Sequence, residues 1–297
     1  MRLVALFASA AIFAGFAAAQ SPVVKPVRGR PLVARMQPMR SGGGGTPTDP
    51  SSLIPTGWTC AGNCGTDGLD GVVPLSPIGS SKYEWVSTAS GVNGVGILPS
   101  GALGSEIDGS TLSTSVFSAT AGTSLNFYFN YVTSDGAGYA DYAWAELFNS
   151  ANTPVALLFT ARTVAAGSIV PGSGMPAPLA TLTPASVPII GGGPAWGPLG
   201  TSTGTCYNAG CGYTGWVNSN YVIPAAGSYY LKVGVVNWLD NEYDSGLALD
   251  GVTIGGVPIN PTSVPALSTW AVVLLGGALL LLGMMAAMRR TASHKIG

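Results

Sequence analysis

The sequence predicts an all-β protein, a jelly-roll-like two-sheet sandwich, with one apolar segment at each end of the chain. Charged residues make up 8% of the 297 residues, whereas glycine and proline contribute 43 and 22 residues. The chain is therefore poor in the Glu, Lys and Arg that favour helices and rich in residues that form turns. Short apolar or alternating runs, broken by Gly, Asn, Asp and Pro, fill the middle of the sequence and are typical of strands.

The N-terminus has the order of a secretory signal peptide. Arg2 precedes an apolar run that ends in Ala17, Ala18 and Ala19. This pattern predicts a signal peptide over residues 1–19 and cleavage by signal peptidase between Ala19 and Gln20. Residues 20–55 follow as a basic, Gly-rich stretch with few large apolar residues, which predicts a disordered linker.

The C-terminus predicts one transmembrane helix. Residues 270–288 contain no charged residue, and Arg289 and Arg290 follow directly. About 20 apolar residues suffice to cross the hydrocarbon core of a bilayer as a helix. The basic tail, residues 289–297, should stay in the cytoplasm. Together with the signal peptide, this predicts a single-pass inner-membrane protein with its body outside.

The body between the two ends is acidic. Residues 41–263 hold all 13 acidic residues but only Lys82, Arg162 and Lys232 as bases, so 3 − 13 gives a charge of −10. Such a surface repels phosphate groups, and we therefore exclude nucleic acid as a partner.

Residues 56–262 form the predicted β-sandwich ectodomain. One face of the first clear strand carries Leu125, Phe127, Phe129 and Tyr131, as expected of a core-facing side. Residues 171–204 hold many Pro and Gly residues, which predicts a long insertion over the surface rather than regular strand. The clearest predicted strands are residues 124–132, 140–149, 155–163, 228–237 and 246–254.

The four cysteines predict disulfides, because exported proteins are oxidised. Three pairings are open in principle, and we favour two local ones, Cys60 with Cys64 and Cys206 with Cys211, since both intervening segments can turn tightly. A zinc site with four thiolate ligands is the alternative, although its spacing would be loose for zinc.

Histidine chemistry is excluded from the exported body. The sole histidine, His294, lies in the predicted cytoplasmic tail, so the body has neither a Ser-His-Asp triad nor a His-based metal site. A carboxylate-dependent glycoside hydrolase needs only two acids and stays open as a minority hypothesis. Its candidate residues are Glu84, Glu106, Glu146 and Glu242.

Aspartates are the candidate metal ligands. Asp135, Asp141, Asp244 and Asp250 lie near turns, and calcium binds oxygen ligands of this kind. The competing interpretation is that each carboxylate caps a turn or keeps the surface soluble.

Two tryptophans are the candidate ligand-binding aromatics. Trp196 lies in the Gly/Pro-rich insertion and Trp216 follows the second cysteine pair, so we expect these two to be exposed. Exposed indole rings can stack on sugars, which makes a carbohydrate-binding module the main alternative function and surface polysaccharide a candidate partner.

The C-terminal segment resembles a known sorting signal. Pro265, Leu267, Ser268 and Trp270 precede the apolar run and match the IPTL type of CTERM segment, whereas Val264, Ala266 and Thr269 differ from its motif. The resemblance implies sorting motif 264–270 within a segment spanning 263–297, and processing by an exosortase-type transpeptidase.

The body is similar to a family of uncharacterised proteobacterial surface proteins with such tails. The resemblance rests on residues 130–144, 158–162, 211–216 and 243–254. No function is established for that family, so the resemblance implies none. The segment 243–254 is also similar to the final strand of many jelly-roll modules. We therefore expect a non-enzymatic cell-surface or extracellular-matrix protein.

Overall fold

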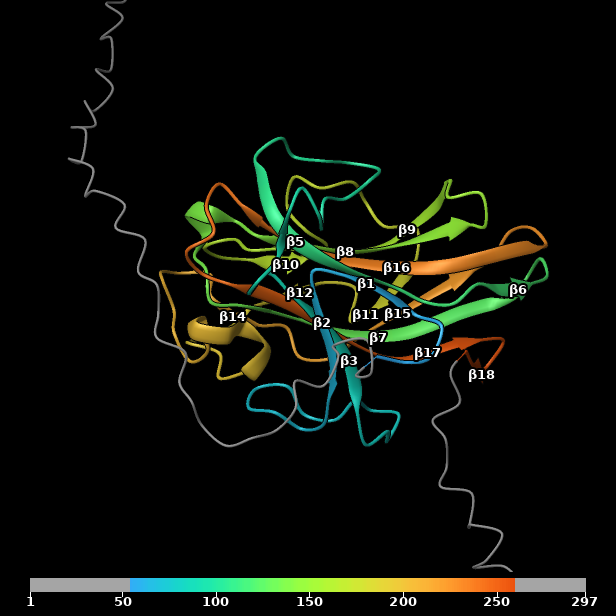
Figure 1. The fold of residues 1–297 in the computed structure, drawn as a ribbon, viewed down its shortest axis with the longest axis horizontal. Helices are drawn as coiled ribbons and strands as arrows, with labels where there is room; N and C mark the ends of the chain where they lie inside the picture. The colour runs from blue at the N-terminus through green and yellow to red at the C-terminus, as the bar shows by residue number, and fades with distance from the viewer. Residues whose placement is uncertain (1–53, 260–297) are drawn as a thin grey trace, which may run out of the picture. The chain divides into compact units, whose positions relative to one another are not determined.

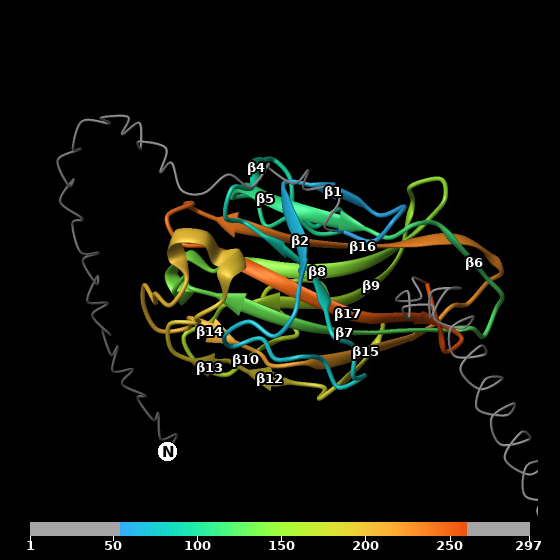
Figure 2. The same cartoon turned by 60° about the horizontal axis from the view of Figure 1, so that its bottom comes forward.

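The computed structural model describes residues 54–259, which form two antiparallel sheets packed face to face (Figure 1). One sheet follows the order β1-β5-β16-β8-β9, and the other follows β11-β15-β7-β17-β3-β2. Figure 2 shows the two layers, with β5, β16 and β8 above β17, β7 and β15. This confirms the predicted all-β sandwich.

The sheets contain seven and nine strands within the described residues, and a two-stranded ribbon lies beside them. The first sheet consists of β1 (Thr59–Ala61), β4 (Val92–Asn93), β5 (Glu106–Ser113), β6 (Phe117–Ala119), β8 (Tyr142–Asn149), β9 (Pro154–Arg162) and β16 (Gly227–Trp238). The second consists of β2 (Asn63–Asp67), β3 (Tyr83–Ser87), β7 (Ser124–Thr133), β11 (Thr181–Thr183), β13 (Ile190–Gly191), β14 (Gly212–Tyr213), β15 (Val217–Val222), β17 (Ser245–Ile254) and β18 (Val257–Pro258). The ribbon pairs β10 (Ser168–Val170) with β12 (Val187–Pro188).

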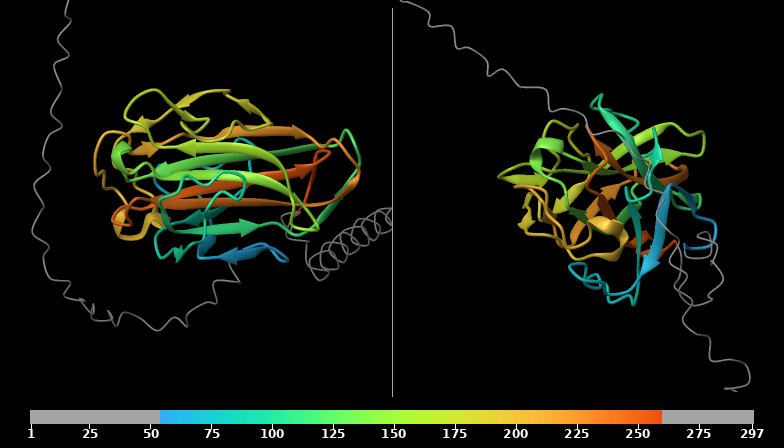
Figure 3. Two further views of the ribbon diagram at one scale, coloured as in Figure 1. Left: turned by 90° about the horizontal axis from the view of Figure 1, so that it is seen from above. Right: turned by 60° about the vertical axis from the view of Figure 1, so that its left-hand side comes forward.

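The main strands alternate between the sheets along the chain. In the series β3, β5, β7, β8, β9, β15, β16, β17, every connection except β8–β9 crosses from one sheet to the other. The left view of Figure 3 shows these strands running side by side, so that their connections gather at two ends. β14 lies at one end and β6 and β18 lie at the other.

The main core lies between the sheets and follows from the two-residue period of the strands. In β7, Leu125, Phe127, Phe129 and Tyr131 are fully buried and point toward the other sheet. The ring of Phe129 stacks on Phe159 of β9 with centroids 3.7 Å apart. The alternation in the sequence therefore predicts the inner face correctly.

The outer faces of both sheets are covered as well. On the first sheet, Trp144 is fully buried beneath the 94–105 connection and donates from Nε1 to the carbonyl of Gly96 at 2.6 Å. On the second sheet, Ala248 and Val132 lie beneath Trp196. The insertion at residues 171–204 supplies part of this cover and contains β11, β12, β13 and a 3-10 helix, η3 (Gly197–Ser202). The expectation of an insertion without regular strand was therefore wrong in detail.

Both local disulfides are present. Cys60 pairs with Cys64 and Cys206 pairs with Cys211, with Cα atoms 6.1 and 5.6 Å apart. Cys60 lies in β1 of the first sheet and Cys64 in β2 of the second, so this disulfide joins the edges of the two sheets. All four cysteines are paired in this way rather than gathered into the four-thiolate zinc site of the alternative hypothesis.

The five clear strands of the sequence agree with β7, β8, β9, β16 and β17 to within two residues at each end. Ile54, which the sequence assigned to the linker, packs against the core. The signal peptide, nearly all of the linker, and the sorting segment at 263–297 lie outside the described residues. Within residues 54–259, no helix is long and apolar enough to cross a membrane.

Candidate functional site

A cleft of about 740 Å³ opens beside the end of β17, where the described chain also begins and ends. β2, β3 and the second half of β17 line it, together with the first residues of the domain, the loop before β3 and the end of the described chain. Its polar lining comes from Thr66, Ser80, Lys82, Glu84, Asp250 and Thr253, and its apolar lining includes Ile54, Pro55, Trp58, Ile78, Val252 and Ile259. The cleft therefore offers donors, acceptors and carbon surfaces to one ligand.

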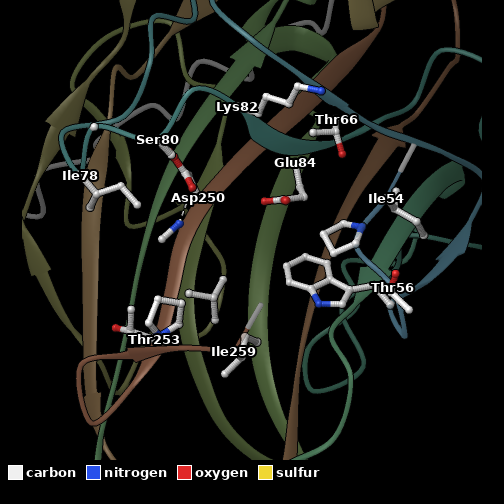
Figure 4. Close-up of a pocket in the computed structure, with 16 residues that line it drawn as sticks. Ile54, Thr56, Thr66, Ile78, Ser80, Lys82, Glu84, Asp250, Thr253 and Ile259 are labelled. Carbon is white, nitrogen blue, oxygen red and sulfur yellow. Dashed lines mark hydrogen bonds between the residues drawn. The ribbon is translucent and has the colours of Figure 1, made fainter. Parts of the chain in front are cut away.

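Glu84 lies in the middle of this cleft. Figure 4 shows its carboxyl group between Ser80 and Asp250 on one side and Ile54 and Thr56 on the other. In β3 it sits opposite Leu249 and on the same side as Val86, the side that faces the core. Burial, and next the charge of Asp250, raise the pKa of Glu84 to about 7.

Asp250 is held in a fixed position by hydrogen bonds. The hydroxyls of Ser76 and Ser80 both donate to its Oδ2, and the backbone N–H of Gly251 donates to Oδ1 at 2.6 Å. Hydrogen bonds to both oxygens fix the orientation of a carboxylate. The two acids of the cleft thus have different environments. Asp250 is surrounded by hydrogen-bond donors, whereas Glu84 is largely buried and lies near the negative charge of Asp250.

A bulge at Gly251 explains the local shape of β17. Gly251 has φ +67°, and the register with β7 breaks between Asp250 and Thr253. A β-carbon at Gly251 would lie 2.8 Å from Cδ1 of Ile78, so the position favours glycine both sterically and in its backbone conformation. The break leaves Asp250 facing the loop that carries Ser76 and Ser80, and it returns Val252 to the core.

Lys82 gives the cleft its positive charge and is exposed at its edge. It is one of three basic residues in the described domain, alongside Arg162 and Lys232. The sequence identified Lys82 only as an isolated base in an acidic body, and it did not predict a cleft there. Pocket-lining hydroxyls such as Thr66 and Ser80 carry no signal in a sequence so rich in Thr and Ser.

The structure does not bring together the four aspartates predicted as calcium ligands. Among residues 54–259, no three His, Cys, Asp or Glu side chains form a metal-binding group. Asp244 and Asp250 are six strand positions apart, about 20 Å at the usual rise per residue. Asp244 instead accepts hydrogen bonds from Ser202 and Thr88 at 2.8 and 3.2 Å.

The expectation that Trp196 is exposed was wrong. Its side chain is fully buried on the outer face of the second sheet, and Nε1 donates to the hydroxyl of Tyr83 at 3.0 Å. The sequence held a signal for this, because Gly246 leaves the space that the indole fills. A β-carbon there would lie 2.5 Å from Cζ3 of Trp196.

Trp216 is half-buried rather than free to stack on a ligand. Its ring meets Tyr83 edge-on with centroids 5.7 Å apart, and Nε1 donates to the carbonyl of Pro74 at 2.8 Å. Neither predicted tryptophan therefore lines the cleft, whereas Trp58 does.

The four glutamates considered for a hydrolase lie in different places. Glu84 lines the cleft, and Glu106 accepts hydrogen bonds from the backbone of Leu103 and Gly104. Glu146 is buried on the side of β8 that faces away from the main core, opposite Lys232. Glu242 is exposed in the β16–β17 connection.

Comparisons with known proteins give distant structural similarity only. No family model and no curated protein matches the chain. The K1 adhesin domain of Lys-gingipain from Porphyromonas gingivalis W83 is similar at 12% identity and a TM-score of 0.33, covering 68% of this chain and 92% of that one. The enzymatically active domain of tailspike protein 4 from bacteriophage CBA120 is similar at 11% identity and a TM-score of 0.30, and the match covers 67% of this chain and 19% of that one.

A third similar structure is the family 11 carbohydrate-binding module from Clostridium thermocellum. It shares 12% identity, has a TM-score of 0.18, and covers 65% of this chain and 95% of the module. Because these neighbours differ in activity and their TM-scores are low, the functional argument rests on the residues of the cleft itself.

Replacing Trp196 should destabilise the fold more than replacing Trp216. Trp196→Ala removes a fully buried indole and should lower the free energy of unfolding by about 3–5 kcal/mol. Trp216→Ala, at a half-buried position, should lower it by about 1 kcal/mol. Urea unfolding of both variants measures the difference. Equal losses in the two variants would show that Trp196 does not pack as described.

Glu84 should make stability depend on pH in a defined direction. Its pKa rises from 4.5 in a free chain to about 7 in the fold, so the folded state holds a proton that the unfolded state has released. The free energy of unfolding should therefore fall as pH rises between these values, because the folded state binds more protons. Glu84→Gln should remove this component.

The measurement is urea unfolding of the wild type and Glu84→Gln at several pH values, with Glu242→Gln as the matched control. Other buried acids contribute equally to all three proteins, so the difference between the curves isolates Glu84. Identical slopes for the wild type and Glu84→Gln would contradict the environment described for this carboxyl group.

Proposed function

We propose that this chain is an exported, non-enzymatic surface protein whose β-sandwich binds carbohydrate in the cleft around Glu84. The observation that carries the proposal is the lining of that cleft. Two carboxyl groups, an ammonium group and several hydroxyls surround a space that is otherwise bounded by Ile, Pro and Trp carbon atoms. Sugars present both hydroxyls and apolar C–H faces, and sites that bind them need this combination.

The strand order supports the jelly-roll class within this proposal. Successive main strands cross between the sheets at every connection but one, which is the pattern of interlocked Greek keys. Binding modules of this class present ligand sites on a rigid sandwich. Here the sheets support Glu84 directly, whereas Lys82 and Ser80 come from the loop before β3.

Export and tethering follow from the two ends of the sequence. The signal-peptide pattern at 1–19, the apolar stretch at 270–288 and the basic tail support a single-pass inner-membrane protein with its sandwich outside. Two disulfides within the described domain agree with an oxidising compartment. We further propose that an exosortase-type transpeptidase processes the segment at 264–270 and releases the domain to the cell surface.

The non-enzymatic part of the proposal rests on the distribution of the acids. The four candidate glutamates occupy separate positions, and only Glu84 lines the cleft. Asp250 is the acid whose charge acts on Glu84, and its hydrogen bonds from Ser76 and Gly251 give it a role in holding the bulge within β17. We therefore assign both acids to ligand contact and turn geometry rather than to bond cleavage.

A glycan array on the mature protein, purified in detergent, tests the binding proposal. The wild type should bind at least one class of glycan. Glu84→Gln and Lys82→Ala should weaken that binding by about tenfold or more, because each removes a charged hydrogen-bonding partner from the ligand. Glu242→Gln, the same chemical change on an exposed loop, should bind as the wild type does.

Three results would contradict parts of this proposal. Absence of any bound glycan would remove carbohydrate as the ligand class. Binding that survives both cleft variants would move the site elsewhere on the sandwich. Shortened glycans, detected by mass spectrometry after incubation and lost in Glu84→Gln, would show that the protein is a hydrolase.

Intact-mass analysis of the protein from its native host tests export and sorting. After separation of inner membrane, outer surface and medium, processing predicts a surface species that begins at Gln20 and ends within residues 264–270. A species in the inner membrane that begins at Gln20 and ends at Gly297 would support a membrane anchor and disprove transpeptidase processing. A species that still begins at Met1 would disprove the signal peptide.

A further inference from the structure

A second set of polar residues lies where β7 and β16 end and β8 begins. Asp135 follows β7, Asp141 precedes β8, and Asp240 follows β16. Asp135 is 1% exposed, and its Oδ1 accepts the backbone N–H of Gly136 at 2.6 Å. Its Oδ2 is buried and accepts no hydrogen bond from the described part of the chain. A buried carboxylate oxygen without a partner is costly, and such atoms are rare in native proteins.

Asp141 is the most enclosed of the three aspartates. It is fully buried, and its carboxylate accepts one hydrogen bond on each oxygen. The backbone N–H of Trp238 donates to Oδ1 at 2.8 Å, and the hydroxyl of Ser245 donates to Oδ2 at 2.7 Å. A carboxylate has about four lone-pair positions, so both oxygens can accept a further partner.

The three carboxylates act on one another electrostatically. Burial, and next the charge of Asp135, raise the pKa of Asp141, and Asp240 adds to the effect. Burial together with Asp240 raises the pKa of Asp135 to about 7. Carboxylates so placed are stabilised by a compensating positive charge.

No basic side chain of the described domain supplies that charge through a hydrogen bond. Arg162 is the nearest base, but its Nε and a terminal nitrogen donate to the carbonyls of Ala140 and Ser173 at 3.1 and 3.2 Å. Its guanidinium also lies 4.6 Å from the ring centre of Trp238. Lys82 lines the cleft, and Lys232 lies opposite Glu146.

We propose that Asp135 and Asp141 bind a calcium ion, with Asp240 at its outer side. The candidate ligands are carboxylate oxygens, which favours a hard cation over a transition metal. Because no third carboxylate converges on the same point within residues 54–259, neutral protein oxygens and water complete the coordination. A site with so few charges should bind weakly, in the millimolar to submillimolar range of extracellular calcium modules.

Three tyrosines beside this position provide a spectroscopic probe. Tyr207 lies between Tyr139 and Tyr243, with ring centroids 5.5 and 5.2 Å apart. Asp135 and Asp240 are both within electrostatic reach of Tyr207. Terbium replaces calcium in such sites, and excited tyrosines close by transfer energy to it. A bound ion would also join the loops that carry these rings.

The test uses the full chain purified in detergent and stripped of metal with a chelator. Adding calcium at about 1 mM should raise the melting temperature, because a ligand that binds only the folded state stabilises it. Terbium should give tyrosine-sensitised luminescence that calcium displaces. Asp135→Asn should abolish both effects, and Asp240→Asn, at a partly exposed position, should weaken terbium binding without preventing folding.

Asp67→Asn on β2, beside the cleft, is the matched control and should keep both effects. Absence of any calcium effect on the wild type would overturn the proposal and leave a shared proton as the compensating charge. An unchanged calcium effect in both Asp135→Asn and Asp240→Asn would also overturn it, because the ion would then bind elsewhere. If Asp135→Asn does not fold, the luminescence of Asp240→Asn decides between these outcomes.

Discussion

The pairing of β7 with β17 in the centre of the second sheet determines most of the structure. Its register runs from Thr133 opposite Ser245 to Leu125 opposite Ile254. One face of the pair supplies Phe129 and Leu249 to the main core, and the other face receives Trp196. One end leads into the cleft and the other into the cluster of aspartates, so both candidate sites depend on this register.

The sequence predicts the inner face of the sandwich well because alternation is a local property. In β7 every second residue is large and apolar, and the pattern alone assigns that side to the core. The outer faces could not be assigned in this way. β17 is buried on both sides, since segments distant in the sequence, such as the insertion carrying Trp196, cover it. A continuous apolar strand does not reveal which segment covers its second face.

The candidate sites were harder to predict because their residues meet through long-range register. Glu84 and Asp250 are 166 positions apart in the sequence numbering, yet β3 and β17 are hydrogen-bonded neighbours. Asp244 and Asp250 show the converse, because they are close in the sequence but lie far apart in space along an extended strand. The local disulfides were predictable for the converse reason, since each joins cysteines only four or five positions apart.

The small number of basic residues gives the buried acids a particular character. With three bases in the described domain, most carboxylates cannot find a cationic partner and depend on hydroxyl and backbone donors instead. Asp250 accepts hydrogen bonds from the hydroxyls of Ser76 and Ser80. Asp244 accepts them from Thr88 and Ser202. Glu84 and Asp135 have fewer donors, and burial raises the pKa of each to about 7. A bound hydroxyl-rich ligand at Glu84, or a cation at Asp135, would supply partners that the described part of the chain does not.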